Sequence, residues 1–409
     1  MTSLRRQAGA EHVAVVDLGY GDAGKGTVVD ALCATTARRA VLRFNGGAQA
    51  AHNVITASGR HHTFAQFGAG TLQGVPTHLT RFMVVDPLAL SAEASALGNP
   101  YDLLTVDEDA LLATPWHRAA NQLREQRRGE GRHGSCGMGV GQTVEYALKN
   151  PAAPRVGDVR SPSRLRARLA QVRSVLTEQY GPLPAPPLPA VVDAFLAFGR
   201  AVSIVDSSYV TTLLNEGPCI FEGAQGVLLD EWRGWHPYTT WSTTTFDNVA
   251  SLCDSFVRLG VVRTYTTRHG AGPLVTEADD LTLPEPHNAR GDWQGAFRTG
   301  HFDAVAHRYA AEVAGGLDGI AVTHLDRVTP ALKMCTSYSL DERPWQRIVP
   351  GPARDLGYQS ALTSLLDRAR PGDMHAPENW AAEIGETLKA PVLVESHGPA
   401  TNDKKVRGL

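Results

Sequence analysis

Short apolar runs rich in β-branched residues recur along the chain and predict strands. They lie at 13–18, 40–44, 82–85, 202–205, 219–221, 320–322 and 391–394. Longer stretches with apolar residues at helical spacing separate them, at 27–38, 163–180, 190–201, 304–314 and 377–388. Strands that alternate with helices favour an α/β fold with a mostly parallel central sheet flanked by helices.

Two stretches interrupt this pattern. The proline-rich run 181–189 cannot form a helix interior or a central strand, because proline lacks the amide donor, and we predict a rigid surface connector rather than a domain linker. The stretch 118–132 is rich in arginine and punctuated by glycine, and we predict a solvated loop there. We expect a single domain over 1–409, with helical and loop insertions around 100–200.

The composition narrows the class of function. The 409 residues are 43% hydrophobic with a net charge of −3, which allows a sizeable core and argues against nucleic acid as the main partner. The five cysteines are scattered without a CxxC pair, so neither a zinc site nor a disulfide framework is indicated. Neither a signal peptide nor an apolar run long enough to span a membrane is found, and we expect a cytoplasmic protein without a membrane partner.

A glycine-rich turn ends the first apolar run, within the segment 13–27. Glycines there surround Asp22 and Lys25, and a helix-like stretch follows. Such a turn lets backbone N–H groups point inward, while the next helix presents its positive end and the lysine adds charge. The segment therefore predicts a phosphate-binding loop.

This loop departs from the usual P-loop pattern. Gly26 stands where serine or threonine is expected, and Thr27 comes one residue late. Asp22 is also unusual, because a carboxylate beside phosphates is costly unless it holds a metal ion or accepts a proton. The alternative is a plain strand–helix turn in which Asp22 caps the helix.

Two further strand ends carry candidate chemistry. Gly46 and Gly47 follow the second strand, and His52 comes shortly after, where it is placed to donate to a phosphoryl oxygen as charge develops. Asp326 follows the strand 320–322, and a carboxylate there can accept both N1–H and N2–H of guanine, which favours GTP over ATP. A structural histidine and a strand-end cap are the respective alternatives.

Taken together, the motifs resemble the adenylosuccinate synthetase family. The resemblance runs in order from about residue 12 to about residue 400. It is carried by Gly21-Asp22-Ala-Gly-Lys25-Gly, the loop from Gly46 to His52, Phe221-Glu-Gly-Ala-Gln225, His236-Pro-Tyr-Thr-Thr240, Thr267-Arg-His269-Gly-Ala-Gly-Pro273, Thr323-His324-Leu-Asp326 and Ser396-His-Gly398-Pro399.

The resemblance implies a P-loop-related, adenylosuccinate synthetase-like fold, a homodimer, and the condensation of IMP with aspartate driven by GTP and Mg²⁺. It implies that Asp22 takes the N1 proton of a 6-oxopurine while Gln225 orients the base. O6 then attacks the γ-phosphate of GTP, Lys25 and His52 stabilise the transferring phosphoryl group, and an amine displaces the phosphate.

The resemblance also implies ligand sets. The expected GTP-binding residues are Gly21, Gly24, Lys25, Gly26, Thr27, His324, Asp326, Ser396 and Gly398. The expected acceptor-binding residues are Asp22, Gln49, Cys136, Gln225 and Thr240. Mg²⁺ would be held by Asp22 and the backbone carbonyl of Ala51, together with phosphates.

Departures from the family pattern fall mainly on the acceptor and amine pockets. The family's phosphate-contacting Asn and Thr are Gln49 and Cys136 here. The arginine that reaches across the family's dimer should fall near Asn150 or Pro151, neither of which can replace it, and Lys149 is the remaining candidate. In the amine pocket, two of the family's arginines are Gly295 and Phe297, and Arg298 alone stays in register. His269 stands where the family has valine, so this pocket is expected to be more apolar or aromatic.

These departures separate three interpretations. Each lost Arg–carboxylate pair would cost roughly 2–4 kcal/mol in a desolvated site, which aspartate binding cannot easily absorb. We therefore favour a specialised paralogue that keeps phosphoryl activation but has another acceptor, another amine, or both. An authentic adenylosuccinate synthetase is the alternative, and a non-catalytic GTP-binding regulatory protein is a third. Asp22, Lys25, His52 and Gln225 together speak against the third, because binding alone needs no proton-transfer pair.

Overall fold

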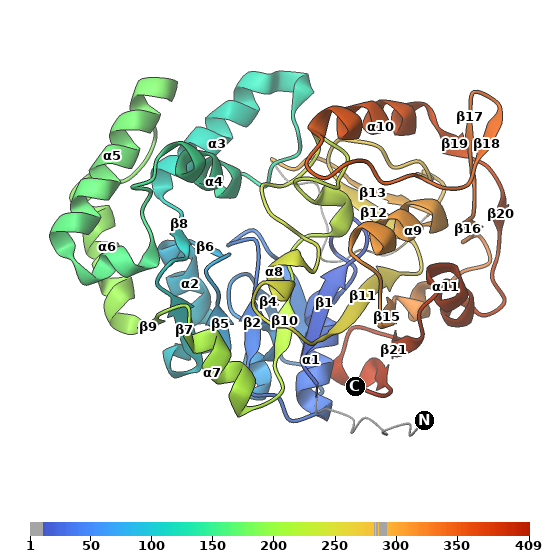
Figure 1. The fold of residues 1–409 in the computed structure, drawn as a ribbon, viewed down its shortest axis with the longest axis horizontal. Helices are drawn as coiled ribbons and strands as arrows, with labels where there is room; N and C mark the ends of the chain where they lie inside the picture. The colour runs from blue at the N-terminus through green and yellow to red at the C-terminus, as the bar shows by residue number, and fades with distance from the viewer. Residues whose placement is uncertain (1–10, 282, 284, 286–292) are drawn as a thin grey trace.

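A ten-stranded sheet runs through the computed structural model, which describes residues 11–281, 283, 285 and 293–409 (Figure 1). In spatial order the strands are β22 (Lys404–Val406), β21 (Val392–Ser396), β15 (Gly319–Thr323), β11 (Val257–Arg263), β1 (Val13–Asp17), β10 (Ile220–Glu222), β2 (Val41–Arg43), β5 (Thr77–Leu79), β7 (Leu104–Asp107) and β9 (Ser203–Val205). Every neighbouring pair is parallel except β21 with β22. The predicted α/β fold with a mostly parallel sheet is confirmed.

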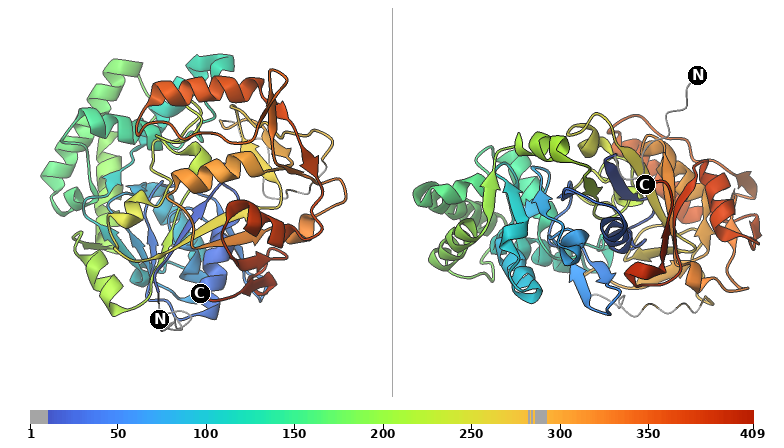
Figure 2. Two further views of the ribbon diagram at one scale, coloured as in Figure 1. Left: turned by 45° about the vertical axis from the view of Figure 1, so that its right-hand side comes forward. Right: turned by 90° about the horizontal axis from the view of Figure 1, so that it is seen from below.

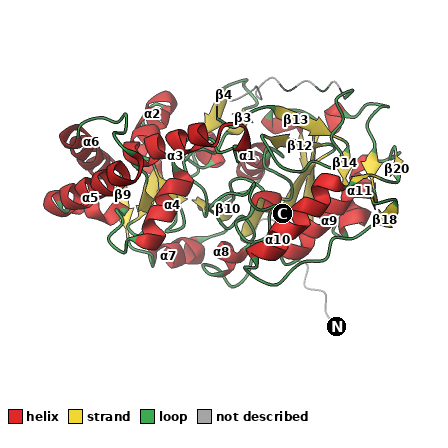
Figure 3. Cartoon of the chain, turned by 90° about the horizontal axis from the view of Figure 1, so that it is seen from above, coloured by secondary structure: helices red, strands yellow, loops and turns green. Residues whose placement is uncertain are grey.

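Helices cover both faces of this sheet (Figures 2 and 3). In the described part of the chain they are α1 (Lys25–Thr35), α2 (Pro87–Leu97), α3 (Pro115–Arg128), α4 (Val140–Lys149), α5 (Pro162–Tyr180), α6 (Leu188–Ala201), α7 (Tyr209–Glu216), α8 (Asp247–Ala250), α9 (Ala304–Val313), α10 (Leu356–Arg368) and α11 (Trp380–Leu388). None of them is long and apolar enough to cross a bilayer. The single domain over 1–409 stays a prediction.

Strand β1 shows why the sheet is covered on both sides. Val13 and Val15 belong to one hydrophobic core, with residues of α1, α2, α5 and α6. Ala14 and Val16 belong to the other core, with residues of α7, α8, α9 and α11. Successive side chains of a strand point to opposite faces, so a continuous apolar run is what a strand buried on both faces requires.

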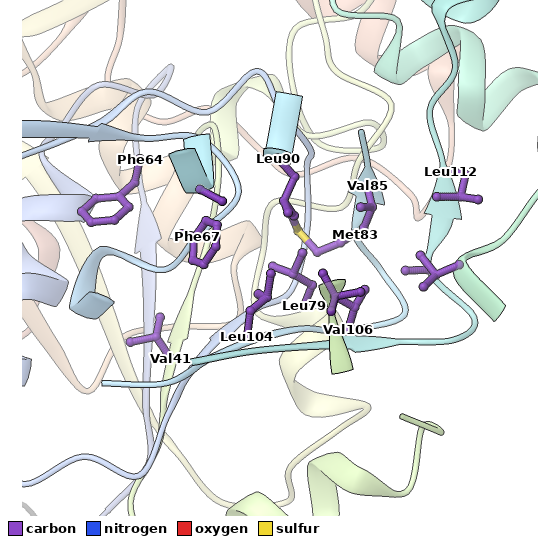
Figure 4. Close-up of a cluster of buried hydrophobic side chains, with 14 of the residues drawn as sticks. Val41, Phe64, Phe67, Leu79, Met83, Val85, Leu90, Leu104, Val106 and Leu112 are labelled. Atoms are coloured by element: carbon purple, nitrogen blue, oxygen red, sulfur yellow. The ribbon is translucent and has the colours of Figure 1, made fainter. Parts of the chain in front are cut away.

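The first core extends to the far edge of the sheet (Figure 4). Val41, Leu79 and Val106 come from three neighbouring strands, and Phe67 and Leu90 pack on them. All five side chains are fully buried. Burying a side chain of this size stabilises the fold by about 1.5–3 kcal/mol, so the cluster anchors the strands whose loops reach the functional site.

Short ladders lie outside the central sheet. They are β3 (His52–Ile55) with β4 (His61–Phe64), β6 (Val84–Val85) with β8 (Leu111–Leu112), β12 (Thr266–His269) with β13 (Phe297–Gly300), β14 (Phe302–Asp303) with β16 (Met334–Cys335) and β20 (Met374–His375), and β17 (Tyr338–Leu340) with β18 (Arg343–Trp345) and β19 (Arg370–Pro371). The predicted strand at 82–85 thus pairs with β8 and not with the central sheet.

The proline run forms the predicted connector, since α5 ends at Tyr180 and α6 begins at Leu188.

The prediction of a solvated loop over 118–132 is wrong, because most of it belongs to α3. Thr114 caps this helix in a capping box with His117, and Pro115 occupies its first turn. Trp116 and Ala120 are buried on its inner face. The arginines lie along the remaining surface. Their number suggested a loop, although the segment is an amphipathic helix that begins with a capping box.

Candidate active site

A cavity of about 1060 Å³ lies over the carboxyl ends of the central strands. The loops that follow β1, β2, β10, β15 and β21 contribute to its lining. Ligand pockets measure about 300–1,000 Å³, so this cavity has room for more than one small molecule. Ligand sites in open α/β sheets gather at this edge because successive loops converge there.

Most of the predicted site residues line this one cavity. They are Gly21, Asp22, Gly24, Lys25, Gly26, Thr27, Gln49, Ala51, His52, Cys136, Gln225, Thr240, His269, His324, Asp326, Ser396 and Gly398. Gly295, Phe297 and Arg298, which were predicted for the amine pocket, are not among the described residues that line it. The structure therefore brings together the predicted nucleotide and acceptor residues, whereas three of the four residues predicted for the amine pocket do not line this cavity.

The phosphate loop is held by a carboxylate that the sequence analysis did not single out. Asp17, the last residue of β1, accepts hydrogen bonds from the amides of Gly19 and Ala23, each at 2.8 Å. Its Oδ2 also lies 3.1 Å from Lys25 Nζ, and both side chains are buried. The ion pair holds the Lys25 ammonium at the start of α1, whose preceding residue, Gly24, adopts φ 94°. A loop fixed in this way presents its amides before any phosphate arrives.

The structure explains the glycine that replaces serine or threonine in the loop. A Cβ on Gly26 would lie 2.5 Å from His52 Cβ and 3.1 Å from His52 Cα. No side chain fits at this distance, because His52 is the first residue of β3 and lies directly against α1. Gly26 is therefore the consequence of placing His52 beside the phosphate loop.

His52 is oriented by a second buried carboxylate. Its Nδ1 lies 2.6 Å from Oε1 of Glu222, the last residue of β10, and Glu222 Oε2 accepts the amide of Ala69 at 2.9 Å. Burial lowers the pKa of His52, although the Glu222 carboxylate opposes this shift. For Glu222, burial acts to raise the pKa, but Arg43 and His52 outweigh it and the pKa falls. The pair is thus a carboxylate and a neutral imidazole whose Nε2 remains for a ligand.

Asp22 lies at the tip of the phosphate loop in a left-handed conformation, with φ 60°. Its Oδ2 lies 3.5 Å from His269 Nε2. The His269 ring packs edge-on against Phe297, with 4.7 Å between ring centroids. Phe297 therefore supports His269 from behind rather than facing a ligand itself.

Amide and hydroxyl groups line the wall directly beside the phosphate loop, where a Cβ on Gly21 would lie 3.7 Å from Gln225 Cα. Gln225 has φ 62° and donates from Nε2 to Thr240 Oγ1 at 2.6 Å. The Oε1 atom of Gln225 and both polar atoms of the Gln49 amide are buried without a hydrogen-bond partner among the described residues. Burial raises the pKa of the Cys136 thiol, so it stays protonated at neutral pH. Buried polar atoms without partners are rare in proteins.

A cluster of charged and aromatic side chains forms another end of the cavity. Arg263 Nη2 lies 2.9 Å from His324 Nε2 and 3.0 Å from Glu285 Oε1. Burial lowers the pKa of His324 well below its usual value, and the neighbouring Arg263 adds to this effect. Asp326 Oδ2 lies 3.0 Å from Arg327 Nε, and both side chains are about one-third exposed. This end can bind a planar base through a carboxylate edge and an imidazole.

The Arg298 guanidinium is hydrogen-bonded to two backbone carbonyls and one carboxylate. Its Nε donates to Gly270 O at 3.0 Å and its Nη2 to Gly272 O at 2.6 Å, while Nη1 pairs with Glu277 at 2.7 Å. Three partners occupy its guanidinium, so Arg298 shapes the loop that follows β12.

Several residues of the site were missed at the level of sequence. Asp17 and Glu222 each end an apolar strand, a position at which parallel sheets present functional side chains, and this signal was visible. The others line the cavity only after tertiary folding, because they come from α3, from the end of β11, from β12 and from loops between distant elements. They are Arg124, Glu125, Arg128, Trp241, Arg263, Arg268 and Glu285.

The donor set around the phosphate loop fits a magnesium ion. Mg²⁺ prefers oxygen ligands and is usually held by one or two carboxylates together with substrate phosphates. Asp22 presents one partly exposed carboxylate in the loop, and Ala51 and Asp22 both line the cavity. No group of three or more His, Cys, Asp or Glu side chains able to hold a metal occurs in the described residues.

A lysine-bearing phosphate loop beside a carboxylate-oriented histidine, facing a second site lined by amides, defines an α/β enzyme that uses a nucleoside triphosphate to activate another ligand. A family model described as adenylosuccinate synthetase matches residues 14–364. The chain belongs to this family and is a C–N bond-forming ligase.

Individual relatives agree with this assignment. Adenylosuccinate synthetase of Acidithiobacillus ferrooxidans is 34% identical over 429 residues, which cover 97% of this chain and 99% of the relative. The fully ligated adenylosuccinate synthetase from Plasmodium falciparum has a TM-score of 0.83 at 21% identity, covering 97% of this chain and 100% of that one. Cyanophage S-2L succinoaminodeoxyadenylate synthetase, bound to dGMP and to dATP as an energy donor, has a TM-score of 0.62 at 19% identity, covering 97% and 95%. At these identities the two structures are evidence for the fold alone.

Proposed function

We propose that this protein is a GTP-dependent ligase that phosphorylates the oxo group of a purine-like nucleotide or nucleoside and replaces it with an amine. The observation that carries the proposal is the meeting of Asp22, Lys25, His52 and Gln225 around one cavity. In this proposal it is a specialised paralogue of adenylosuccinate synthetase. Authentic adenylosuccinate synthetase activity, from IMP, aspartate and GTP, is the alternative, favoured by the names of relatives such as the 34% identical one.

The first half of the reaction is phosphoryl transfer. Asp22 accepts the N1 proton of the oxo-purine while Gln225 holds the base edge, so that negative charge develops on O6. O6 attacks the γ-phosphorus, the bond from that phosphorus to the bridging oxygen breaks, and GDP leaves with the electron pair. Lys25 donates to the transferring phosphoryl oxygens, where charge develops, and His52 donates from Nε2 in its protonated form, which the Glu222 carboxylate favours. When bound by Asp22 and the Ala51 carbonyl, Mg²⁺ supplies charge neutralisation for the phosphates.

The second half is displacement at carbon. The amine nitrogen forms a bond to C6, the C6–O6 bond breaks, and inorganic phosphate leaves with O6. The nitrogen gives up a proton to restore neutrality, so oxo compound, amine and GTP yield the aminated product, GDP and phosphate. Phosphorylation is needed because an amide-like carbonyl is a poor electrophile without a good leaving group.

The amine side of the cavity supports a changed amine. Gly295 and Phe297 offer no guanidinium, and Arg298 is bonded to two carbonyls and a carboxylate. His269, supported by Phe297, presents an aromatic surface next to Asp22. A dicarboxylate would find few donors here, whereas an amine with less negative charge would bind without those arginines. The cyanophage relative, with dGMP and dATP bound, is an example of this fold with other nucleotides.

Phosphate release with the full chain tests the proposal. GTP or ATP is combined with Mg²⁺, a panel of oxo-purine nucleosides and nucleotides, and varied amines, and we expect acceptor- and amine-dependent release with GTP. Efficient adenylosuccinate formation at micromolar aspartate with IMP would instead establish the authentic synthetase. Asp22→Asn should retain GTP binding in calorimetry and lose turnover; an active Asp22→Asn enzyme contradicts its role as the proton acceptor.

We also propose a homodimer, on the basis of family membership. Light scattering at working concentration tests it, and a monomer would count against it.

A further inference from the structure

A chain of side-chain hydrogen bonds connects the base end of the cavity with the phosphate loop. The base end is the part of the lining formed by Arg263, His324 and Asp326. Arg263 Nη2 lies 2.9 Å from His324 Nε2, and His324 Nδ1 lies 2.8 Å from Thr323 Oγ1. Thr323 Oγ1 in turn lies 2.7 Å from the carbonyl oxygen of Ala23. Thr323 and Ala23 are 300 positions apart, so the chain of bonds joins the last residue of β15 to the loop that follows β1.

The direction of each bond follows from what the groups can donate. A guanidinium has only N–H donors, so Arg263 donates and His324 Nε2 accepts. Burial and the neighbouring Arg263 lower the pKa of His324 well below its usual value, so the ring is neutral and its single proton lies on Nδ1. Nδ1–H therefore donates to Thr323 Oγ1, and the Thr323 hydroxyl donates its own proton onward. The carbonyl of Ala23, at 2.7 Å, is a nearer acceptor for this proton than that of Val262, at 3.2 Å.

The Thr323 hydroxyl fixes the peptide between Ala23 and Gly24. In a trans peptide the C=O and N–H groups point in opposite directions, so a carbonyl turned toward Thr323 turns the amide of Gly24 away from it. Gly24 lines the cavity directly before the first residue of α1. The peptide on the other side of Ala23 is held as well, because Asp17 Oδ2 accepts the Ala23 amide at 2.8 Å. Asp17 and Thr323 are both buried, so the two bonds are shielded from water.

The backbone at Gly24 gives this bond its importance. The φ of Gly24 is 94°, and glycine adopts either sign of φ readily, so the peptide before it can rotate at low cost. A rotated peptide would present the Ala23 carbonyl oxygen to the cavity in place of the Gly24 amide. A carbonyl oxygen repels phosphate oxygens, whereas an N–H group at the start of a helix attracts them. The orientation of this one peptide therefore decides whether the loop gains or loses a phosphate contact.

We infer that Thr323 and His324 are positioning residues, which hold the Ala23–Gly24 peptide so that the Gly24 amide donates to a phosphate of the bound nucleotide. Arg263 accounts for the direction of the chain, since its donors oblige His324 to present Nδ1–H to Thr323. All of these residues belong to one subunit. The inference rests on the proposed function in that the nucleotide is taken to be GTP or GDP, and it holds whichever acceptor and amine are used.

Calorimetry of GDP with Mg²⁺ on the full chain tests the inference. Thr323→Val removes the hydroxyl at nearly constant volume, and we expect it to weaken GDP binding about tenfold or more, as for the loss of a hydrogen bond to an ionised group. Thr323→Ser keeps the hydroxyl and should bind GDP within about threefold of the wild type. Thr363→Val is the matched control, because Thr363 is another buried threonine whose hydroxyl donates to a backbone carbonyl, that of Gln359, but it does not line the cavity.

His324→Asn tests the chain of bonds separately and leaves the Thr323 hydroxyl in place. Asparagine tolerates the left-handed backbone at this position, where φ is 59°. We expect it to weaken GDP binding about threefold or more in the wild-type background and to add nothing in the Thr323→Val background, since without the hydroxyl His324 has nothing to direct. Additive losses would show two separate roles and overturn the inference.

The remaining outcomes separate the inference from the proposed function. Unchanged GDP affinity in Thr323→Val, or no recovery in Thr323→Ser, overturns the inference and leaves the proposed function standing. If Thr323→Val does not fold, unchanged GDP affinity in His324→Asn overturns the inference. A wild-type protein that binds no GDP overturns both, whereas GDP binding that depends on Thr323, without acceptor-dependent phosphate release from GTP with any amine, overturns only the proposed function.

Discussion

Nδ1 of His52 lies 2.6 Å from Oε1 of Glu222, and both side chains are buried beneath the phosphate loop. The two residues are 170 positions apart and lie on β3 and β10. A carboxylate on one ring nitrogen fixes the tautomer and orientation of a histidine, so the other nitrogen faces the ligand in a defined state.

The first prediction concerns this pair. Glu222→Gln removes the charge that orients His52 and should lower kcat about 10- to 100-fold, with a smaller effect on the KM for GTP, because the partner of a working histidine acts on the transition state. Steady-state phosphate release measures both constants. Glu93→Gln is the matched control, since Glu93 is another buried carboxylate that accepts backbone amides, at Ala65 and Gln66, but does not line the cavity. A Glu222→Gln enzyme with unchanged kcat contradicts the role.

The second prediction follows from the contact between Gly26 and His52. Gly26→Ala places a methyl group 2.5 Å from His52 Cβ, so either the loop or β3 must move. We expect a loss of about 1–3 kcal/mol in the free energy of unfolding and at least about a hundredfold loss of kcat/KM, since a small displacement of a catalytic group is costly. Urea unfolding and phosphate release give the two numbers. Gly131→Ala, where the added methyl meets nothing within 4 Å, should change neither.

Much of the sheet could be predicted from sequence because strands buried on both faces are continuous apolar runs. The first strand, 13–18, matches β1 within one residue. Strand β5 does not show this pattern, since its three residues include Thr77 and His78. These two polar residues are buried with their side chains hydrogen-bonded, so they form no apolar run. Helix α3 was not predicted because its many arginines suggested a solvated loop, although Thr114 and Pro115 mark a helix start.

The site divides in a similar way. Loops at strand ends could be predicted, since glycine, lysine and aspartate in that setting have few other uses. The carboxylates behind them, Asp17 and Glu222, are marked in the sequence by their places at the ends of apolar strands, but their partners are known only once the strands are paired side by side. The contact of Trp241 with Gly141 joins residues one hundred positions apart, and no local sequence pattern predicts it.

The third prediction tests the base end of the cavity. Asp326→Asn keeps the size of the side chain but loses the charge that would accept two N–H groups of guanine. We expect the KM for GTP to rise about 10- to 100-fold, as for the loss of a charge-assisted hydrogen bond, and the preference for GTP over ATP to fall with it. Competition between the two nucleotides in the phosphate-release assay measures the ratio. Asp341→Asn, at an exposed aspartate paired with Arg368, is the control, and retained discrimination in Asp326→Asn refutes the assignment.

The last prediction concerns stability in mild acid. Burial lowers the pKa of His117 to about 3, whereas an unfolded histidine titrates near 6.5. Between these values the unfolded chain binds a proton that the folded chain does not, so the stability that this group contributes is complete above pH 6.5 and declines as the pH falls. The slope is about 1.4 kcal/mol per pH unit, so His117 accounts for about 2–3 kcal/mol between pH 6.5 and 4.5.

His117→Gln isolates this effect. Glutamine suits the third helical position of a capping box, so the contacts of Thr114 at the start of α3 are preserved while the titrating ring is removed. Urea unfolding at pH 6.5 and 4.5 should show the variant losing about 2–3 kcal/mol less than the wild type over this interval. Burial also lowers the pKa of His78, to about 4, but this group is present in both proteins and cancels. His397→Gln, at an exposed histidine, should follow the wild type; a His117→Gln curve that runs parallel to the wild type as well would show that His117 is not the group that titrates.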